Sequence, residues 1–343
     1  MQSRKKLDAR VVLWSAAAGF IGACWLQPAA AGAATDAAEA QAQATWRADI
    51  ARIEVPADGC FHAAYPNLYW ERVACDVGQP RAHTVPPTVK EGNTVGDGKD
   101  YVAQVKGFIS QAYGTFPSVT GVTSEKSVGV PAFGDGGILG PNEYTLQVNT
   151  NFNGTTAACK SHSGCTVWQQ FIYSTDYLTE GEAAAFMQYW LIGWGGSKCP
   201  KGFGSDGEGD CYGNSKYATV PDLKIQDLAG ETITGAVVAG GNDTVTFTYG
   251  GDSYSVSGKD SMLDIATVWN EVEFNVVGDA GGSRAQFNKG SSVSVNLAVS
   301  SGTTAKPACK KNAGTTGETN NLALGPCTTS GGATPAIAFT ESN

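Results

Sequence analysis

Residues 144–152 read YTLQVNTNF, a stretch in which apolar and polar side chains alternate. Successive side chains of a β-strand point to opposite faces of its sheet, so this period of two predicts a strand with one apolar and one polar face. The later stretch 268–277, VWNEVEFNVV, has the same period over its second half. It places Glu271, Glu273 and Asn275 on one side of a second strand and three apolar residues on the other.

Similar short runs recur along the chain, and clusters of glycine, asparagine and aspartate separate them. The expected strands cover residues 144–152, 166–174, 184–194, 232–238, 244–249, 253–257, 268–277, 291–299 and 336–340. Forty-four glycines and few charged residues also favour turns and strands over helices. We therefore predict an all-β fold, an antiparallel β-sandwich or jelly roll of the concanavalin-like kind, with an internal helix only near residues 101–112.

The N-terminal residues have the composition of a secretory signal peptide. Four cationic side chains among the first ten residues precede an apolar run at 11–23, and residues 31–33, AGA, provide a small-residue cleavage site. The apolar run is too short to predict a membrane span. Residues 21–24, IGAC, leave a second possibility open, in which Cys24 carries a lipid anchor. The sequence thus predicts a secreted, extracellular protein, with a form lipid-anchored at Cys24 as the alternative.

Cysteine usage also indicates an oxidising compartment. Outside the leader there are eight cysteines, an even number that predicts disulfide bonds in an exported chain. They fall into four couples along the sequence, and pairing within a couple has the smallest loop-closure entropy. The expected bonds are Cys60–Cys75, Cys159–Cys165, Cys199–Cys211 and Cys309–Cys327. No Cys-x-x-Cys pair occurs and there are only three histidines, so we expect no metal centre and no cofactor.

Charge limits the partners. The formal charge is −9, and removal of a leader with four cations and one anion would lower it to −12. A chain this acidic is not expected to bind nucleic acid or an anionic membrane through its overall charge. We divide it into a signal peptide at 1–33, an N-terminal extension or linker at 34–90 with the first disulfide, and a β-sandwich domain at 91–343. We expect a monomer that acts on a polypeptide substrate or binds an extracellular polymer.

The sequence lacks common signatures of hydrolases and nucleotide-binding proteins. There is no Gly-x-Ser-x-Gly, no His-Glu-x-x-His and no phosphate-binding glycine loop before a helix. Asp206, Glu208 and Asp210 alternate with glycines in the third expected disulfide loop, a spacing that could hold calcium. Tyr217, however, stands where an EF-hand loop needs its last acid. A solvated acidic loop is the simpler interpretation.

Aromatic side chains gather on two of the expected strands, with glutamines among them. The candidates for a substrate-binding face are Trp168, Gln170, Tyr189 and Trp190. An aromatic floor with interleaved amides is typical of carbohydrate-binding clefts and peptide grooves. An aromatic sandwich core is the alternative, although the glutamines count against it because a buried amide needs hydrogen-bond partners.

Three of the expected strands, taken in order, resemble strands of the eqolisins, the fungal-type glutamic peptidases. Residues 146–152, LQVNTNF, resemble the family's L-Q-T-G-V-x-F strand. Residues 167–173, VWQQFIY, are similar to its W-Y-E-W-Y strand, and residues 272–277, VEFNVV, to its A-E-W-I-V-E strand. A glycine-rich loop and Phe287 follow, as a loop and a phenylalanine do in the family.

The resemblance covers residues 140–300 and implies a jelly roll and a metal-free endopeptidase that acts in acid. It implies that Glu273 acts as general base and then as general acid, while Gln147 holds the attacking water and stabilises the oxyanion. The chain departs from the family in the longer segment between these two residues and in Val277, which replaces the motif's second acid. The family's N-terminal tryptophan strands have no counterpart that we can place.

Three functions are compatible with the sequence. The first is an exported glutamic-type endopeptidase with a Gln147/Glu273 dyad. The second is a non-catalytic carbohydrate- or cell-surface-binding module that uses the aromatic face. The third is a structural surface protein, in which both dyad residues lie on a solvent-facing strand. The relative positions of Gln147, Glu273 and the aromatic side chains discriminate between them.

Overall fold

The structure is a computed structural model that describes residues 29–77, 100–129, 139–177, 181–195, 198–279, 282–311 and 318–343. Met1–Gln41 and Ala42–Asn343 form two compact units. In the first unit the description is limited to the beginning of helix α1 (Ala29–Ile50). Most of the predicted signal peptide, including Cys24, lies outside the described residues, as does the end of the predicted linker. None of the helices in the described part is long and apolar enough to cross a membrane.

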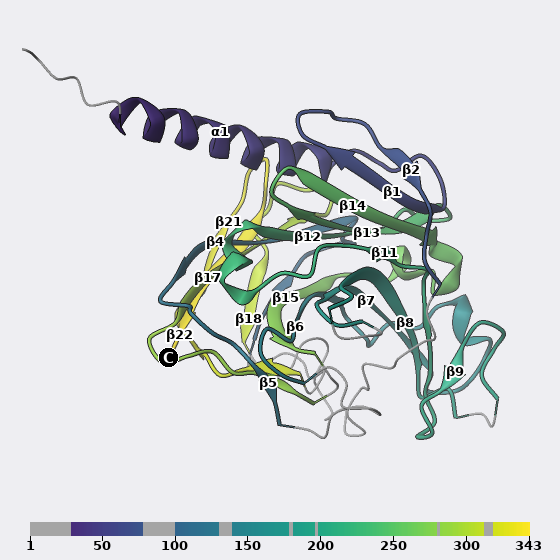
Figure 1. Cartoon of the computed structure of the whole chain (residues 1–343). Helices are drawn as coiled ribbons and strands as arrows, with labels where there is room; N and C mark the ends of the chain where they lie inside the picture. Colours follow the sequence, from purple (N-terminus) through teal and green to yellow (C-terminus); the bar gives the residue numbers. More distant parts are fainter. Residues whose placement is uncertain are drawn as a thin grey trace, which may run out of the picture. The chain divides into compact units, whose positions relative to one another are not determined.

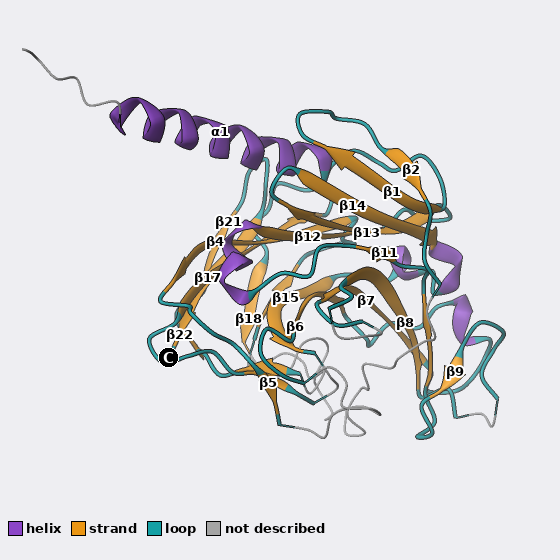
Figure 2. Cartoon of the chain, viewed as in Figure 1, coloured by secondary structure: helices purple, strands orange, loops and turns teal. Residues whose placement is uncertain are grey.

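Two large antiparallel sheets make up most of the second unit (Figures 1 and 2). The ten-stranded sheet consists, in spatial order, of β2 (Glu71–Val73), β1 (Gly59–Ala64), β14 (Asp252–Lys259), β13 (Asn242–Tyr249), β12 (Glu231–Ala236), β4 (Gln111–Thr120), β17 (Ser292–Ser300), β22 (Ala336–Ser342) and β20 (Ala323–Leu324), with β21 (Thr328–Ser330) also paired to β22. The nine-stranded sheet consists of β18 (Ala308–Lys311), β3 (Tyr101–Gln104), β15 (Glu271–Gly278), β6 (Tyr144–Thr150), β7 (Thr166–Ser174), β8 (Ala184–Ile192), β10 (Cys211–Asn214) and β9 (Gly204–Ser205), with β11 (Ala218–Thr219) also paired to β8.

Smaller elements connect these sheets. A three-stranded sheet is formed by β19 (Thr319–Asn320), β16 (Arg284–Ala285) and β5 (Ser127–Val128). Short 3₁₀ helices are η1 (Ala157–Cys159), η2 (Ile225–Gly230), η3 (Asp260–Met262) and η4 (Ile265–Thr267). The two large sheets pack face to face, which confirms the predicted antiparallel β-sandwich.

The apolar sides of both sheets form one core between them. In β15, Val272, Phe274 and Val276 belong to this core, as the period of two predicts. Two phenylalanines from the nine-stranded sheet reach glycines of the opposite sheet. A Cβ atom added at Gly114 would lie 2.4 Å from the ring of Phe274, and one at Gly235 would lie 2.4 Å from the ring of Phe171. Glycine at these positions therefore lets the sheets approach over two aromatic rings.

The described part of the predicted extension contributes to the ten-stranded sheet. β1 pairs with β14 over its whole length and carries Cys60 into the core. At the end of α1, Trp46 donates from its indole nitrogen to the carbonyl of Asn67 at 2.6 Å. Trp46, Ile50 and Ala63 pack together as a small separate cluster. These contacts attach the helix end to the strand that follows it.

All four disulfides form with the expected local pairing, which confirms that prediction. Their Cα–Cα separations range from 5.2 to 6.6 Å, within the usual span of the bond. Each bond closes a short loop, and the loop of Cys199–Cys211 contains β9.

The helix expected near residues 101–112 is wrong. These residues form β3 and the start of β4, which lie in different sheets. β3 is hydrogen-bonded between β15 and β18, and its residues Tyr101, Val102 and Ala103 are buried. Pairing with strands far away in the sequence overrides the local pattern, because β-structure is stabilised mainly by its neighbours.

We expect Gly114→Ala to destabilise the fold by about 1–3 kcal/mol, because the added methyl group overlaps Phe274 in a close-packed core. Urea denaturation at constant slope measures this change. Gly204→Ala is the matched control in a strand, since its Cβ would meet the nearest atom at 3.8 Å. Equal unfolding midpoints for the two variants would contradict the proposed packing.

Candidate functional site

The face of the nine-stranded sheet that points away from the core, here called the outer face, is rich in buried polar side chains. It is formed by alternate residues of β6, β7, β8 and β15, whose other residues fill the core. Its buried polar members are Thr145, Gln147, Asn149, Gln170, Ser174, Gln188, Glu271, Glu273 and Asn275. Buried amides and carboxylates are costly without partners, so their contacts determine what this face can do.

The three strands of the sequence motifs are neighbours, with β6 between β15 and β7. They therefore share one sheet. Gln147 lies opposite Asn275 on β15, and Glu273 lies opposite Asn149 on β6. Gln147 and Glu273 therefore occupy diagonal positions on the same face, with 1% and 3% of their surfaces exposed. This arrangement differs from that of two residues on a solvent-facing edge strand.

Gln147 uses all of its hydrogen-bonding capacity. Its Nε2 donates to Thr145 Oγ1 at 2.9 Å and to Glu318 Oε2 at 2.8 Å. Its Oε1 accepts from Asn149 Nδ2 at 3.2 Å and from Gln170 Nε2 at 3.0 Å. A primary amide has two N–H donors and two acceptor lone pairs, so every position is occupied by the protein.

Asn149 joins the two predicted catalytic residues. Its Nδ2 donates to Gln147 Oε1 and also to Glu273 Oε2, at 3.1 Å. The Glu273 carboxylate is thus in direct contact with the side-chain amide of Asn149. Sequence reasoning missed this residue, although its position two residues after Gln147 on one strand face was visible in the period of two.

Sequence reasoning also missed Glu318 as a residue of this site. It lies just before β19 and is 171 residues from Gln147 in the chain. Asn320, two residues later, anchors this segment to β15 by donating to the carbonyl of Val276 at 3.2 Å. No local pattern connects Glu318 to the motifs, so only the tertiary structure reveals the contact.

The network continues toward the aromatic candidates. Trp190 Nε1 donates to Gln170 Oε1 at 3.1 Å and to Gln188 Oε1 at 3.0 Å. The rings of Trp168 and Trp190 are 6.1 Å apart, and Tyr212 continues the row at 5.3 Å from Trp190. Trp168, Gln170 and Trp190 are therefore brought together on the outer face, and all three are buried.

Tyr189 does not join them. It belongs to the core between the sheets, because adjacent residues of β8 point to opposite faces. Its surroundings raise its pKa, chiefly through burial. The four residues proposed as one binding face are thus divided between two faces.

A second polar group lies at the β3 side of the outer face. Glu271 accepts from Gln104 Nε2 at 2.6 Å and pairs with Lys310. Asn275 Nδ2 donates to both oxygens of Asp100, at 2.7 and 2.9 Å, and to Glu341. These contacts satisfy the remaining polar residues of β15 on either side of Glu273.

Several buried or half-buried carboxyl groups near the sheet ends hold their protons unusually strongly. Burial, with Asp176 as a hydrogen-bonded neighbour, raises the pKa of Glu143 to about 9. Burial also raises the pKa of Asp279 well above its ordinary value, although Ser174 donates to it at 2.9 Å. Burial raises the pKa of Glu231 to about 8, against the lowering effect of the Tyr144 hydroxyl at 2.6 Å. Such groups are neutral in acid, where their burial costs least.

We expect the free energy of unfolding to fall as the pH rises. A carboxyl whose pKa is higher in the folded state stabilises the fold fully below its ordinary pKa, and this contribution is lost as the pH rises through the folded value. For Glu231 the window runs from 4.5 to about 8. The slope is at most about 1.4 kcal/mol per pH unit for each group.

Glu231→Gln tests this directly, because glutamine resembles the protonated acid and can still accept from Tyr144. The variant should match the parent at pH 4 and be more stable at pH 8 in urea denaturation. Exposed Glu208→Gln is the control and should change neither value. A parent protein more stable at pH 8 than at pH 4 would contradict the raised pKa values of the buried carboxyls.

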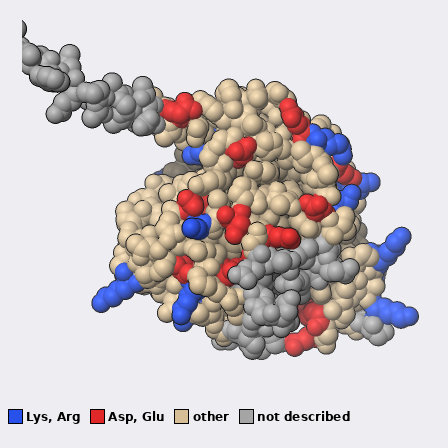
Figure 3. Space-filling model, in the orientation of Figure 1, with Lys and Arg blue, Asp and Glu red and all other residues tan. Residues whose placement is uncertain are grey.

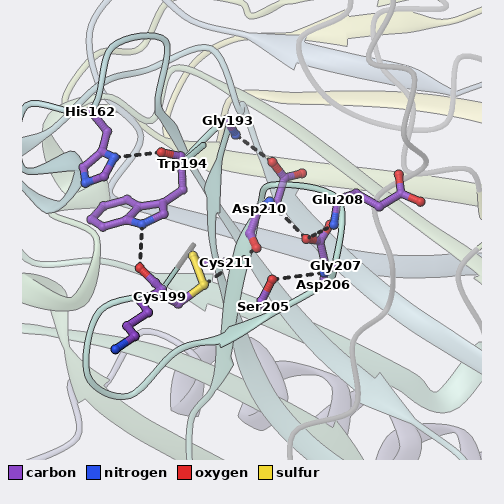
Figure 4. Close-up of a disulfide and its surroundings, with 11 residues drawn as sticks. His162, Gly193, Trp194, Cys199, Ser205, Asp206, Gly207, Glu208, Asp210 and Cys211 are labelled. Carbon is purple, nitrogen blue, oxygen red and sulfur yellow. Dashed lines mark hydrogen bonds between the residues drawn. A yellow bond between two sulfur atoms is a disulfide. The ribbon is translucent and has the colours of Figure 1, made fainter. Parts of the chain in front are cut away.

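Two acidic residues of the Cys199–Cys211 loop accept hydrogen bonds from backbone N–H groups in and beside the loop (Figure 4). Asp206 Oδ1 accepts from the backbone N–H groups of Glu208 and Asp210, at 2.9 and 3.0 Å. Asp210 Oδ1 accepts from Gly193 N–H at 2.7 Å. Over the residues described, no cluster of three or more His, Cys, Asp or Glu side chains is arranged to hold a metal ion. These contacts favour a self-capped acidic loop over a calcium loop.

Surface charge does not gather into a basic patch on the face drawn in Figure 3. Carboxylates are dispersed among uncharged atoms, and the cations lie mainly toward the rim. This distribution agrees with the formal charge of −9. It gives no basis for nucleic-acid binding on that face.

Fold and site define an antiparallel β-sandwich whose outer face carries a connected network of carboxylates and amides. No family model matches the sequence, and no curated protein matches it. A solved structure, the crystal structure of scytalido-glutamic peptidase with a transition state analog inhibitor, is similar over 72% of this chain and 98% of that chain. The identity is 11% and the TM-score is 0.32. This is a distant resemblance, and it assigns no role to any residue.

Proposed function

We propose that this chain is an exported endopeptidase that acts in acid, with Glu273 as its general acid–base and the amides of Gln147 and Asn149 beside it. The observation that supports this proposal is the contact of Asn149 Nδ2 with both Glu273 Oε2 and Gln147 Oε1. It places a carboxylate and two side-chain amides within one buried hydrogen-bonded group. The sequence resemblance to glutamic peptidases implies catalytic roles for Gln147 and Glu273.

The chemistry needs no group beyond these side chains and water. The Glu273 carboxylate takes a proton from a water molecule, whose oxygen attacks the carbonyl carbon of the peptide bond. Amide N–H groups stabilise the negative oxygen of the tetrahedral intermediate. The protonated carboxyl then gives its proton to the leaving nitrogen as the C–N bond breaks. The cycle needs Glu273 in both its ionised and its protonated form, so we expect it to run in an acidic medium.

Export is supported by the disulfide framework. All four bonds join cysteines that are close in the sequence, and such a framework is expected in an oxidising compartment. The raised pKa values of the half-buried Glu143 and the buried Glu231 also favour an acidic exterior. We infer a secreted monomer with a polypeptide substrate.

Carbohydrate binding without catalysis is the second candidate. The observation that favours it is the buried indole Nε1 of Trp168, which has no hydrogen-bond partner among the described residues. The Trp168 ring lies beside Trp190, which in turn contacts Tyr212. A sugar hydroxyl could accept from that N–H while its ring stacks on the aromatic row. In the described arrangement the row is buried, so such binding requires these rings to become accessible.

Cleavage of an acid-denatured protein between pH 2 and 6 tests the peptidase. Wild type should be active, and Glu273→Gln should abolish turnover because it removes the proton acceptor. Gln147→Ala should lower the rate by about 10²–10³, as the loss of an oxyanion donor does. Glu208→Gln, an exposed acid of the Cys199–Cys211 loop, should keep full activity.

Circular dichroism and the unfolding midpoint establish that each variant is folded. A folded wild type without activity over the whole pH range would reject the peptidase. Binding of oligosaccharides that depends on Trp168, with no proteolysis, would favour the second candidate.

A further inference from the structure

The saturation of Gln147 conflicts with the role that the proposed peptidase gives it. An oxyanion needs a free N–H donor, yet both N–H groups of Gln147 donate within the protein, to Thr145 and to Glu318. Thr145 belongs to the same strand and is two residues away, so this contact is part of the sheet's own face. Glu318 is brought in from a different element, the segment leading into β19.

The two partners differ in chemistry as well. A carboxylate oxygen carries negative charge, as the oxygen of a tetrahedral intermediate or a newly cleaved peptide carboxylate does. Glu318 Oε2 lies 2.8 Å from Gln147 Nε2, within the range of a charge-assisted hydrogen bond. Glu318 thus places a carboxylate oxygen at the N–H donor of Gln147 that the substrate oxygen needs.

Hydrogen bonds of the two residues after Glu318 anchor this segment to neighbouring parts of the fold. Thr319 N–H donates to the carbonyl of Ser283 at 3.0 Å, and Asn320 Nδ2 donates to Val276 O and, at 3.0 Å, to Glu341 Oε1. Glu318 is 1% exposed and Gln147 is equally buried. The contact is therefore an ordered part of the fold rather than a chance encounter of surface side chains.

We propose that Glu318 is an internal inhibitor of the site, a carboxylate that occupies the Gln147 amide in place of the substrate oxygen. This inference rests on the proposed function for its effect on rate. The occupation itself does not depend on catalysis. The site so described accepts carboxylates, so the carboxylate of a cleaved peptide is the class of ligand that should compete for it.

Truncation of Glu318 gives an atom-for-atom test. Glu318→Ala retains Cβ and removes a CH₂–COO⁻ group, whose size and charge acetate reproduces. In the variant, acetate should bind and shift the side-chain NH₂ resonances of Gln147 in a ¹⁵N-correlated spectrum. In wild type the same acetate concentrations should leave these resonances unchanged, because Glu318 fills the position.

Activity gives the second measurement. Glu318→Ala should raise kcat/KM by about ten-fold, since a charged hydrogen-bond partner no longer competes with the substrate. Acetate should then inhibit the variant and not the wild type. Glu231→Gln is the matched control, a buried carboxyl that accepts from the Tyr144 hydroxyl in the core between the sheets. It should show no gain.

The outcomes separate the two proposals. Acetate-dependent shifts of Gln147 without proteolysis by any variant would retain the occupied carboxylate site and reject the peptidase. A fall in kcat/KM in Glu318→Ala, or the absence of acetate binding to it, would overturn the inhibitory role. If the alanine variant does not fold, Glu318→Gln replaces it. Its neutral oxygen should hold Gln147 less strongly, so kcat/KM should again exceed the wild-type value, and an unchanged or lower value would overturn the proposal.

Discussion

The alternation of side chains across the nine-stranded sheet is the constraint on which the rest of the molecule depends. One set of residues must fill the core against the opposite sheet, where Phe171 and Phe274 reach glycine backbones. The intervening residues are thereby forced onto the outer face, whatever their chemistry. Because that face is buried as well, each amide there must find partners. Packing on one side of the sheet thus requires an ordered polar network on the other.

The need for partners also explains why the hydrogen bonds from Trp190 to Glu318 all donate in the same direction. Trp190 Nε1 can only donate, and an ionised Glu318 can only accept. Between them, Gln170 and Gln147 each accept on the tryptophan side and donate on the glutamate side. Reversal of either amide would place donor against donor or acceptor against acceptor. The orientation of Gln147 therefore follows from its neighbours, and it directs the Asn149 nitrogen toward Glu273.

Part of this architecture could be predicted from the sequence. The predictable features depend on residues close together in the chain, and the others depend on contacts between distant residues. Strands and disulfides depend on local periodicity and short loops, and both were accessible. The assignment of Gln147 and Glu273 to one face needed only strand parity, and the same parity excludes Tyr189 from the face of Trp190. Glu318 depends on a contact across 171 residues that no local rule encodes. The helix predicted near residues 101–112 is wrong for the same reason, because β3 pairs with strands that are distant in the sequence.

The chemistry open to the outer face follows from which ionisable groups touch its amides. His62 pairs with Asp252 in the other sheet, and His162 stacks on Trp194 at 3.6 Å, so both described imidazoles are engaged elsewhere. Carboxyls contact Gln147 and Asn149 directly. In the proposed peptidase, proton transfer at these amides would therefore fall to glutamate. Buried acids such as Glu231, which are neutral at low pH, stabilise the fold in that same range. The acidic medium of the proposed peptidase is thus also the one in which these carboxyls contribute most to stability.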